Sequence, residues 1–133
     1  MSKLWHLAAV AGAAVMVTTF LVLVPAHCAF ASGDASEGSD LFEQECSECH
    51  SVVAGRNKKG PSLFGVVGRH SGSLASYHYS DAMGNAHLIW TPQTLARYLS
   101  GPKHLVPGTK MKYSGLSGQQ DRNDLISFLE TQH

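Results

Sequence analysis

One short motif constrains this chain more than any other feature of its sequence. Two cysteines three positions apart are followed directly by a histidine, in the order Cys46-Ser47-Glu48-Cys49-His50. On a helix, the two thiols would lie one turn apart on one face, with the imidazole on the same side. This spacing is typical of covalent attachment to the two vinyl groups of one haem. It therefore predicts one haem c, bonded to Cys46 and Cys49, with His50 as an axial iron ligand.

Other uses of such a cysteine pair are less consistent with the sequence. A thioredoxin-like redox pair would need a βαβ context, which the sequence does not predict. A structural zinc site would need four ligands, and there is no second cysteine pair. A plain disulfide would not need His50. Haem attachment is the interpretation that uses all three side chains.

The first 31 residues do not resemble part of a folded domain. Lys3 is followed by a run without charged residues, Leu4 to Val24; Pro25 then breaks the run before Ala29-Phe30-Ala31. This is the order of a secretory signal peptide, although the run is also long enough for an uncleaved membrane anchor of ~20 residues. We expect residues 1–31 to be a signal peptide, with an anchor as the alternative. The haem domain is then residues 32–133, and the protein is periplasmic, or membrane-anchored in the alternative.

The short length of residues 32–133 also favours a cofactor. A chain of this size buries a small core and usually needs a disulfide, a metal or a cofactor to stabilise it. Cys46 and Cys49 are too close in sequence to stabilise much as a disulfide, whereas a haem would supply a large apolar centre. The formal net charge is +0, so nucleic acid is not an expected partner.

Hydrophobic spacing and capping residues predict an all-α fold of about four to five helices. The expected segments are 35–50, with Asp34 as N-cap and Glu37 as its capping-box partner; 80–84, capped by Ser80; 91–100, capped by Thr91 with Pro92 in its first turn; and 117–129, beginning near Ser117 with Gln120 as partner. Residues 51–79 and 103–115 read as long, glycine-containing loops. Loops of this length need something to organise them, and a haem that they wrap would do so. The first and last helices should pack together at Gly38, with Phe128 as the approaching ring.

The iron needs a sixth ligand or an open position. The candidates after the first helix are Met83, Met111 and five histidines: His70, His78, His87, His104 and His133. Met111 stands out because Pro107-Gly108-Thr109-Lys110 forms a stiff turn before it. Such a turn can hold a weak thioether on iron, and this ligand raises the reduction potential.

Several motifs then carry a family resemblance. They are Gly38 and Phe42 before the cysteine motif, Gly60-Pro61-Ser62-Leu63-Phe64-Gly65 with Gly68-Arg69, Tyr79-Ser80-Asp81-Ala82, Trp90, Leu95 with Tyr98 and Leu99, the Pro107–Met111 loop, and the closing helix at Leu125–Leu129. In order and spacing, from Gly33 to Leu129, the chain resembles class I cytochromes c, both bacterial cytochrome c2 and mitochondrial cytochrome c. The resemblance implies their fold, their single covalent haem and the axial pair His50 and Met111.

The resemblance also implies supporting roles. The Pro61 carbonyl would accept the second ring N–H of His50, and Tyr98 would donate a hydrogen bond toward the Met111 sulfur. The haem propionates would otherwise be buried charges without partners, and four side chains would hold them. These are Arg69, Tyr77, Tyr79 and Trp90. Two positions depart from the family: Met83 stands where the mitochondrial proteins have asparagine, and Glu45 where many relatives carry a docking lysine.

The expected function is one-electron transfer between respiratory or photosynthetic redox complexes, not enzymatic catalysis. A bc-type complex, an oxidase, a reaction centre or a dehydrogenase could each be the partner. We expect a monomer that docks through Lys103, Lys110 and Lys112, the basic residues around Met111. The alternatives are a haem peroxidase, which needs an open iron position, and a haem subunit of a larger complex, which would co-purify with it.

Overall fold

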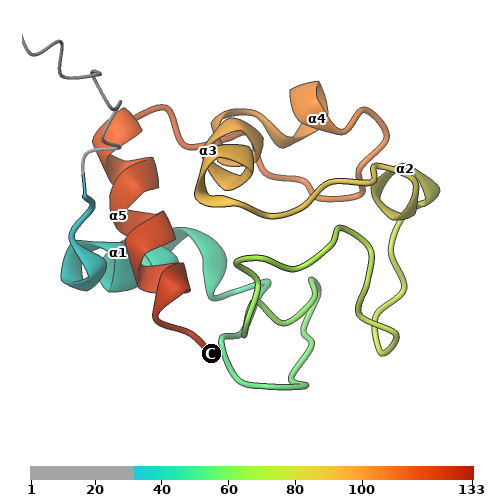
Figure 1. Ribbon diagram of the computed structural model, residues 1–133, viewed down its shortest axis with the longest axis horizontal. Coiled ribbons are helices and arrows are strands. Elements are labelled where there is room, and N and C mark those ends of the chain that lie inside the picture. The colour runs from blue at the N-terminus through green and yellow to red at the C-terminus, as the bar shows by residue number, and fades with distance from the viewer. Residues whose placement is uncertain (1–31) are drawn as a thin grey trace, which may run out of the picture.

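The computed structural model describes residues 32–133; the predicted signal peptide or anchor, residues 1–31, lies outside them. Five α-helices and one π-helical turn follow in order (Figure 1): α1 (Ala35–Leu41), the π-turn η1 (Phe42–Cys46), α2 (Asp81–Gly84), α3 (Pro92–Ser100), α4 (Pro102–Leu105) and α5 (Gln119–Glu130). No strand occurs in residues 32–133, so the predicted all-α fold is confirmed. No helix in that range is long and apolar enough to cross a membrane.

The first and last helices pack against each other, as predicted, and α1 crosses α5 in Figure 1. Gly38 is buried at the crossing, where an added Cβ would lie 2.0 Å from the carbonyl oxygen of Asp124 and 2.8 Å from Cβ of Phe128. The predicted neighbour Phe128 lies at this crossing, with its Cβ against Gly38. The backbone of α5 at Asp124 makes the closest approach, and the centroid of the Phe128 ring lies 5.5 Å from that of the Phe42 ring.

The N-terminus of α1 is capped by Asp34, but not in the capping box that the sequence predicts. The Asp34 carboxylate accepts hydrogen bonds from the backbone N–H groups of Ser36, at 2.8 Å, and Glu37, at 3.4 Å. In a capping box, the Glu37 side chain would accept the Asp34 N–H. That N–H instead donates to Asp124 of α5 at 2.7 Å. The start of the first helix is therefore fixed by the last one.

The predicted continuous helix over residues 35–50 changes character part of the way along. After α1, the chain widens into η1, and the N–H of Ser47 donates to the carbonyl of Phe42, five residues back, at 2.8 Å. The N–H groups of Cys49 and His50 then both donate to the carbonyl of Cys46, at 3.0 and 2.9 Å. The cysteine motif thus lies on a helical turn that follows a π-bulge, a feature often found at functional sites.

Two helices begin at their predicted caps. The Ser80 hydroxyl accepts the N–H of Met83 at the start of α2, at 3.3 Å. The Thr91 hydroxyl accepts the N–H of Thr94 at the start of α3, at 3.1 Å, and Pro92 occupies its first turn. Both caps are local side chain to backbone contacts, which is why local sequence reveals them.

Two expectations in the C-terminal third are wrong. Residues 103–115 are not entirely loop, because Pro102 both ends α3 and begins the single turn α4, where Val106 N–H donates to the Pro102 carbonyl. The last helix begins at Gln119 rather than near Ser117, with Gly118 at its N-cap and no side-chain cap. Arg122 instead donates to the carbonyls of Leu116 and Ser117, at 2.6 and 2.7 Å.

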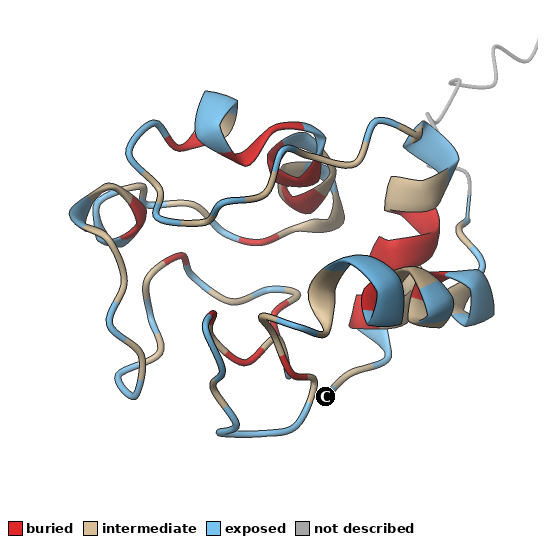
Figure 2. Ribbon diagram, turned by 180° about the vertical axis from the view of Figure 1, so that it is seen from behind, coloured by how far each residue is buried: buried red, intermediate tan, exposed pale blue. Residues whose placement is uncertain are grey.

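The long segment 51–79 has no helix, yet its backbone is well bonded. The buried Ser62 hydroxyl donates to the Val53 carbonyl at 2.8 Å. Backbone bonds of 2.9 Å join Gly68 and Arg69 to Trp90. Buried positions lie on α3, α5 and the loops that face them (Figure 2). The core comprises Phe42, Val66, Met83, Trp90, Leu95, Tyr98, Leu99, Val106, Leu125, Ile126 and Leu129.

Candidate cofactor site

A cavity of about 510 Å³ lies between the helices and the long loops, within the range of about 300–1,000 Å³ that small-molecule sites occupy. Its walls are mostly apolar, with a few polar groups. They are formed by Cys46, Cys49, His50, Lys59, Gly60, Pro61, Leu63, Val66, Arg69, Tyr77, Tyr79, Ser80, Met83, Trp90, Leu95, Tyr98, Leu99, Thr109, Lys110, Met111, Lys112, Leu125 and Leu129. All ten residues predicted to bind or support a haem are therefore on one cavity. The aliphatic walls from α3 and α5 are parts of the site that the sequence did not predict.

The two cysteines line the cavity as free thiols. Burial raises the pKa of Cys46 to about 11, and the charges of Glu45 and Cys49 add to this effect. The thiol is therefore protonated at neutral pH. Because the thiolate is the form that reacts in disulfide exchange, Cys46 is poorly disposed to pair with Cys49.

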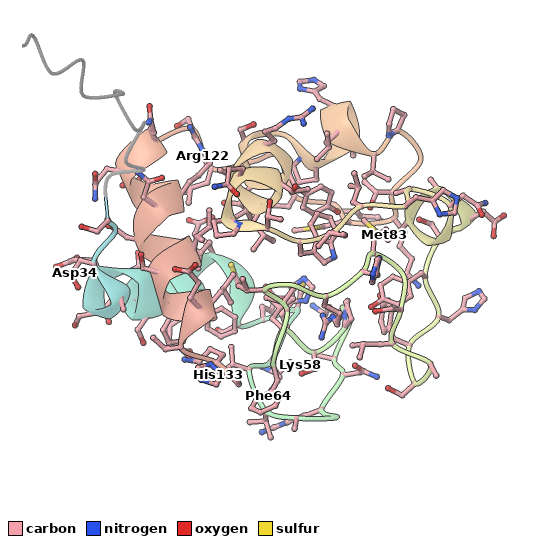
Figure 3. All side chains as sticks on the ribbon, viewed as in Figure 1. Asp34, Lys58, Phe64, Met83, Arg122 and His133 are labelled. Atoms are coloured by element: carbon pink, nitrogen blue, oxygen red, sulfur yellow. The ribbon has the colours of Figure 1, made fainter. Side chains whose placement is uncertain are left out.

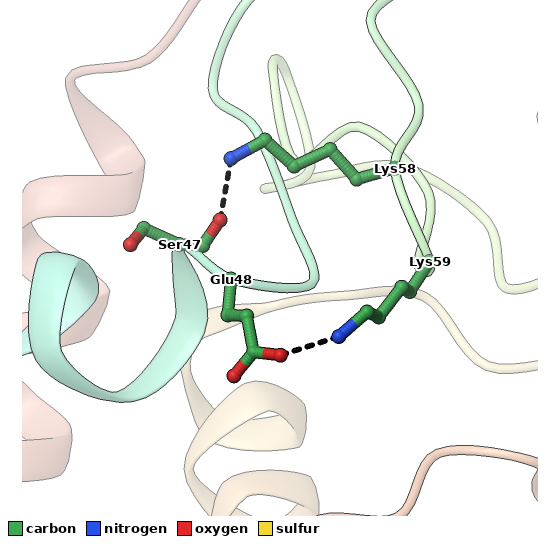
Figure 4. Close-up of polar contacts among 4 residues, drawn as sticks. All are labelled: Ser47, Glu48, Lys58 and Lys59. Carbon is green, nitrogen blue, oxygen red and sulfur yellow. Dashed lines mark hydrogen bonds and ion pairs between the residues drawn. The ribbon is translucent and has the colours of Figure 1, made fainter.

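The loop at residues 58–60 holds the cysteine turn in place. Lys58 donates to the Ser47 carbonyl, and Lys59 forms an ion pair with Glu48 (Figure 4). Both side chains of that ion pair are largely exposed, so it adds little stability by itself. A backbone bond of 2.7 Å from Gly60 N–H to the Cys49 carbonyl completes the contact. The two positions between the cysteines thus anchor the turn to its neighbouring loop.

His50 is oriented by its backbone neighbours. Its Nδ1 lies 2.8 Å from the Pro61 carbonyl oxygen, so Nδ1–H is the donor and Nε2 keeps its lone pair. Burial lowers the pKa of His50, and the bond to Pro61 opposes this shift. The ring is thus neutral at pH 7, which is the form that binds a metal.

Met111 faces the same cavity, within reach of a tyrosine. The Tyr98 hydroxyl lies 3.4 Å from the Met111 sulfur and 3.3 Å from the Thr109 hydroxyl. Thr109 also accepts the N–H of Met111 at 3.4 Å. From the sequence, Thr109 is predicted only as part of a stiff turn. Its signal is its place two residues before Met111, where a hydroxyl can bond to the following backbone.

One polar atom in the cavity wall has no partner. Arg69 donates to the carbonyls of Phe64 and Ser62, at 3.0 and 2.9 Å, while its buried Nε finds no hydrogen-bond acceptor within residues 32–133. Such an atom costs free energy unless an anion or water meets it. A carboxylate of a bound cofactor would supply the missing acceptor.

The three aromatic residues expected to support the cofactor contact other residues of the cavity wall. Tyr77 and Tyr79 contact each other edge to face, with ring centroids 4.9 Å apart, and the Tyr77 hydroxyl donates to the Lys59 carbonyl at 2.9 Å. Trp90 is buried against Tyr98, also at 4.9 Å. All of them are on the cavity wall.

The remaining candidates for the sixth ligand differ in burial and in whether they line the cavity. Met83, on α2, is buried and lines the cavity (Figure 3). The other five are exposed and are not on the cavity wall: His70, His78, His87, His104 and His133. Two thioethers therefore face the cavity, and only that of Met111 receives a tyrosine hydroxyl.

The three candidate docking lysines differ in their surroundings. Lys103 and Lys112 border a second hollow of about 240 Å³, together with Gly101, His104, Tyr113 and Ser114. The Lys110 ammonium is directed elsewhere: it donates to the His78 carbonyl and lies 4.5 Å from the centre of the Tyr77 ring. The structure thus brings Lys103 and Lys112 together at the hollow, whereas Lys110 meets Lys112 at the cavity wall and bonds to the 77–78 loop.

The chemistry of this site fits a covalently attached haem. Two thiols and an imidazole lie on one turn, a thioether lies on another segment of the same wall, and a guanidinium has an unused donor. The apolar remainder suits a porphyrin, and Gly60 leaves the room that the His50 ring occupies, since an added Cβ would lie 2.3 Å from its Cε1. The all-α fold and this site together fit the class of small c-type cytochromes.

Comparison with known proteins makes the class more specific. A family model described as Cytochrome c matches residues 35–133. Cytochrome c2 of Rhodopila globiformis is 50% identical over 99 residues, which cover 74% of this chain and 93% of the relative. Cytochrome c of Cochliobolus lunatus is 49% identical over 102 residues, covering 76% and 94%. Cytochrome c of Arabidopsis thaliana is 50% identical over 99 residues, covering 74% and 88%.

This chain belongs to the cytochrome c family. The resemblance drawn from the sequence is thereby confirmed. The cofactor of the family is one covalently bound haem c, and its function is to carry electrons.

Proposed function

We propose that this protein is a monohaem electron carrier that works outside the cytoplasmic membrane and passes single electrons between redox complexes. In this proposal, Cys46 and Cys49 would hold the haem covalently, and His50 and Met111 would be the ligands of its iron. The observation that carries the proposal is that two thiols, a neutral imidazole and a thioether share one cavity wall. Haem iron supplies the one-electron chemistry when it is bound.

The side chains around these four residues would hold and orient the cofactor. Pro61 fixes the tautomer and the ring plane of His50. Tyr98 positions the Met111 thioether, and Arg69 would neutralise a propionate. With an imidazole and a thioether both available as ligands, the protein would leave no iron position open to substrate. This supports a carrier rather than a peroxidase, which would need an open position.

The finer assignments concern location and partners. Residues 1–31 have the pattern of an export signal, with an anchor as the alternative. The basic hollow at Lys103 and Lys112 supports docking of an acidic surface on a redox complex. A bc-type complex, an oxidase, a reaction centre or a dehydrogenase would each suit a monomeric carrier of this kind.

The first test is the intact mass and visible spectrum of the exported protein. We expect the mass of residues 32–133 plus one haem, and a haem that stays with the protein during acid–acetone extraction. Cys46→Ala and Cys49→Ala should each leave at most one thioether bond and little holoprotein. Haem that is extracted from the unmodified protein would contradict covalent attachment.

A pair of methionine variants tests the axial ligand. Met111→Ala should abolish the weak red absorption band of ferric thioether-ligated haem, because the only thioether that meets Tyr98 is removed. Met83→Ala is the matched control, since Met83 lines the same cavity. Loss of the band in Met83→Ala, with its retention in Met111→Ala, would transfer the assignment to Met83.

A further inference from the structure

One hydrogen bond connects two distant parts of the chain beside the cavity. The Tyr113 hydroxyl donates to Oε2 of Glu45 at 3.2 Å, across 68 positions of sequence. Glu45 immediately precedes Cys46, and Tyr113 follows Met111 by two residues. The bond therefore links the segment with the thiols to the segment with the thioether.

The stretch that carries Tyr113 has few other polar restraints, although Gly115 packs against Ser100, where an added Cβ would lie 2.5 Å from the carbonyl oxygen. Within residues 32–133, this is the only hydrogen bond made by residues 112–115. Both ends of the stretch are fixed: Met111 N–H donates to Thr109, and Leu116 N–H donates to the Leu99 carbonyl at 2.7 Å. A four-residue stretch between fixed ends thus depends on one side chain for its polar contact with the rest of the protein.

The position of this stretch matters for the cavity. Lys112 lines both the cavity and the outer hollow, and Tyr113 and Ser114 line the hollow. Lys112 is therefore the residue of this stretch that borders both spaces. Tyr113 is half-buried while Glu45 is exposed, so the bond lies at the surface, where it can open without unfolding the core.

We propose that the hydrogen bond between Glu45 and Tyr113 is a latch that keeps residues 112–115 closed, with Lys112 at the cavity wall, and thereby positions Met111. Glu45 and Tyr113 are positioning residues in this proposal, since they act through the segment that carries the thioether. The positioning role rests on the proposed function of Met111, whereas closure of the stretch does not. A hydrogen bond of this kind shifts a local equilibrium by about 2- to 10-fold.

The first experiment measures amide hydrogen exchange of residues 112–116 in the holoprotein. Tyr113→Phe and Glu45→Ala should each speed exchange by about 2- to 10-fold, and the double variant should be no faster than the faster single variant. Glu45→Gln, which keeps an acceptor, should fall between. Glu43→Ala is the control, because it removes a carboxylate that is also exposed and that makes no side-chain bond within residues 32–133. Unchanged exchange, or additive effects in the double variant, would overturn the latch.

The second experiment asks whether closure acts on Met111. Imidazole should bind the ferric holoprotein about 2- to 10-fold faster in Tyr113→Phe, while its melting temperature and that of Glu43→Ala stay unchanged. Faster exchange without faster imidazole binding would refute the positioning role. If Met111→Ala keeps the red absorption band while Tyr113→Phe and Glu45→Ala still speed amide exchange, the ligand assignment is refuted and the closure is not.

Discussion

Gly60 shows how one missing side chain determines where another lies. Its N–H donates to the Cys49 carbonyl, and an added Cβ would lie within 2.3–2.8 Å of three atoms of the His50 ring. Gly60 does not have a positive φ, so lack of space, and not backbone conformation, requires glycine here. The ring is also held by Pro61, so it cannot move aside without losing that bond.

Gly60→Ala should therefore lower both holoprotein yield and stability. Overpacking of a fixed ring typically costs about 1–3 kcal/mol in the free energy of unfolding, and thermal unfolding of the purified protein measures it. Gly84→Ala is the matched control, since no atom lies within 4 Å of an added Cβ there. Equal stabilities of the two variants would mean that the His50 ring yields easily.

At the scale of helices, the contact between α1 and α5 depends on close backbone approach. Asp124 contributes twice: its carbonyl lies against Gly38, and its carboxylate accepts the N–H of Asp34. Gln120 donates to the same carboxylate at 2.8 Å. The start of α1 and the middle of α5 thus share one polar group, which ties the two ends of the domain together.

Gly38→Ala tests this contact, and two effects of the substitution on stability oppose each other. Alanine favours an isolated helix by about 1 kcal/mol over glycine, whereas overpacking costs about 1–3 kcal/mol. Because the obstructing atoms belong to the α5 backbone, we expect overpacking to dominate and the free energy of unfolding to fall. Ser36→Ala, at an exposed position of α1, should leave denaturant unfolding nearly unchanged. A more stable Gly38→Ala protein would count against the tight crossing.

The parts of this fold that the sequence predicts are those determined locally. Ser80 and Thr91 bond to backbone three residues away, so their helices begin where expected. The capping box at Glu37 fails because Asp124, 90 positions from Asp34, takes the N–H instead. Nothing within the motif itself signals a π-turn at residues 42–46, because the sequence there keeps ordinary helical spacing.

The residues of the candidate site also divide into those that local sequence predicts and those that only the fold brings together. Cys46, Cys49 and His50 follow from spacing alone, and Met111 from a stiff turn supported by family resemblance. The bond between Tyr113 and Glu45 joins residues 68 positions apart, and no periodicity marks it. Such long-range polar pairs depend on the completed fold, so only the structure reveals them.

For the whole molecule, the uneven distribution of charge matters more than its sum. The formal net charge is +0, yet Lys103 and Lys112 share a hollow beside the cavity. Lys110, with its ammonium bonded to the 77–78 loop, is less available to a partner. Glu45 lies near the same edge and should weaken the attraction of an acidic partner.

The rate of electron transfer to a natural partner should fall as salt rises, because the Debye length is only ~8 Å at physiological ionic strength. Lys112→Glu should slow this reaction by about 10-fold at low salt. Arg56→Glu is the control: it changes the net charge equally, at an exposed loop position that does not line the hollow. Equal slowing by the two variants in stopped-flow measurements would indicate a general charge effect and no defined docking face.

The π-turn η1 has a consequence for the geometry of the whole site. Each residue of an α-helix advances the chain by about 100° around the helix axis. The wider turn at residues 42–46, which ends at Cys46, therefore changes the angular phase between Gly38, which faces α5, and the two cysteines. The direction in which the thiols point is thus set by the number of residues in one turn as well as by their identity. Deleting one residue between Phe42 and Glu45 would rotate the attachment site about the axis of α1, although every residue of the cysteine motif would still be present.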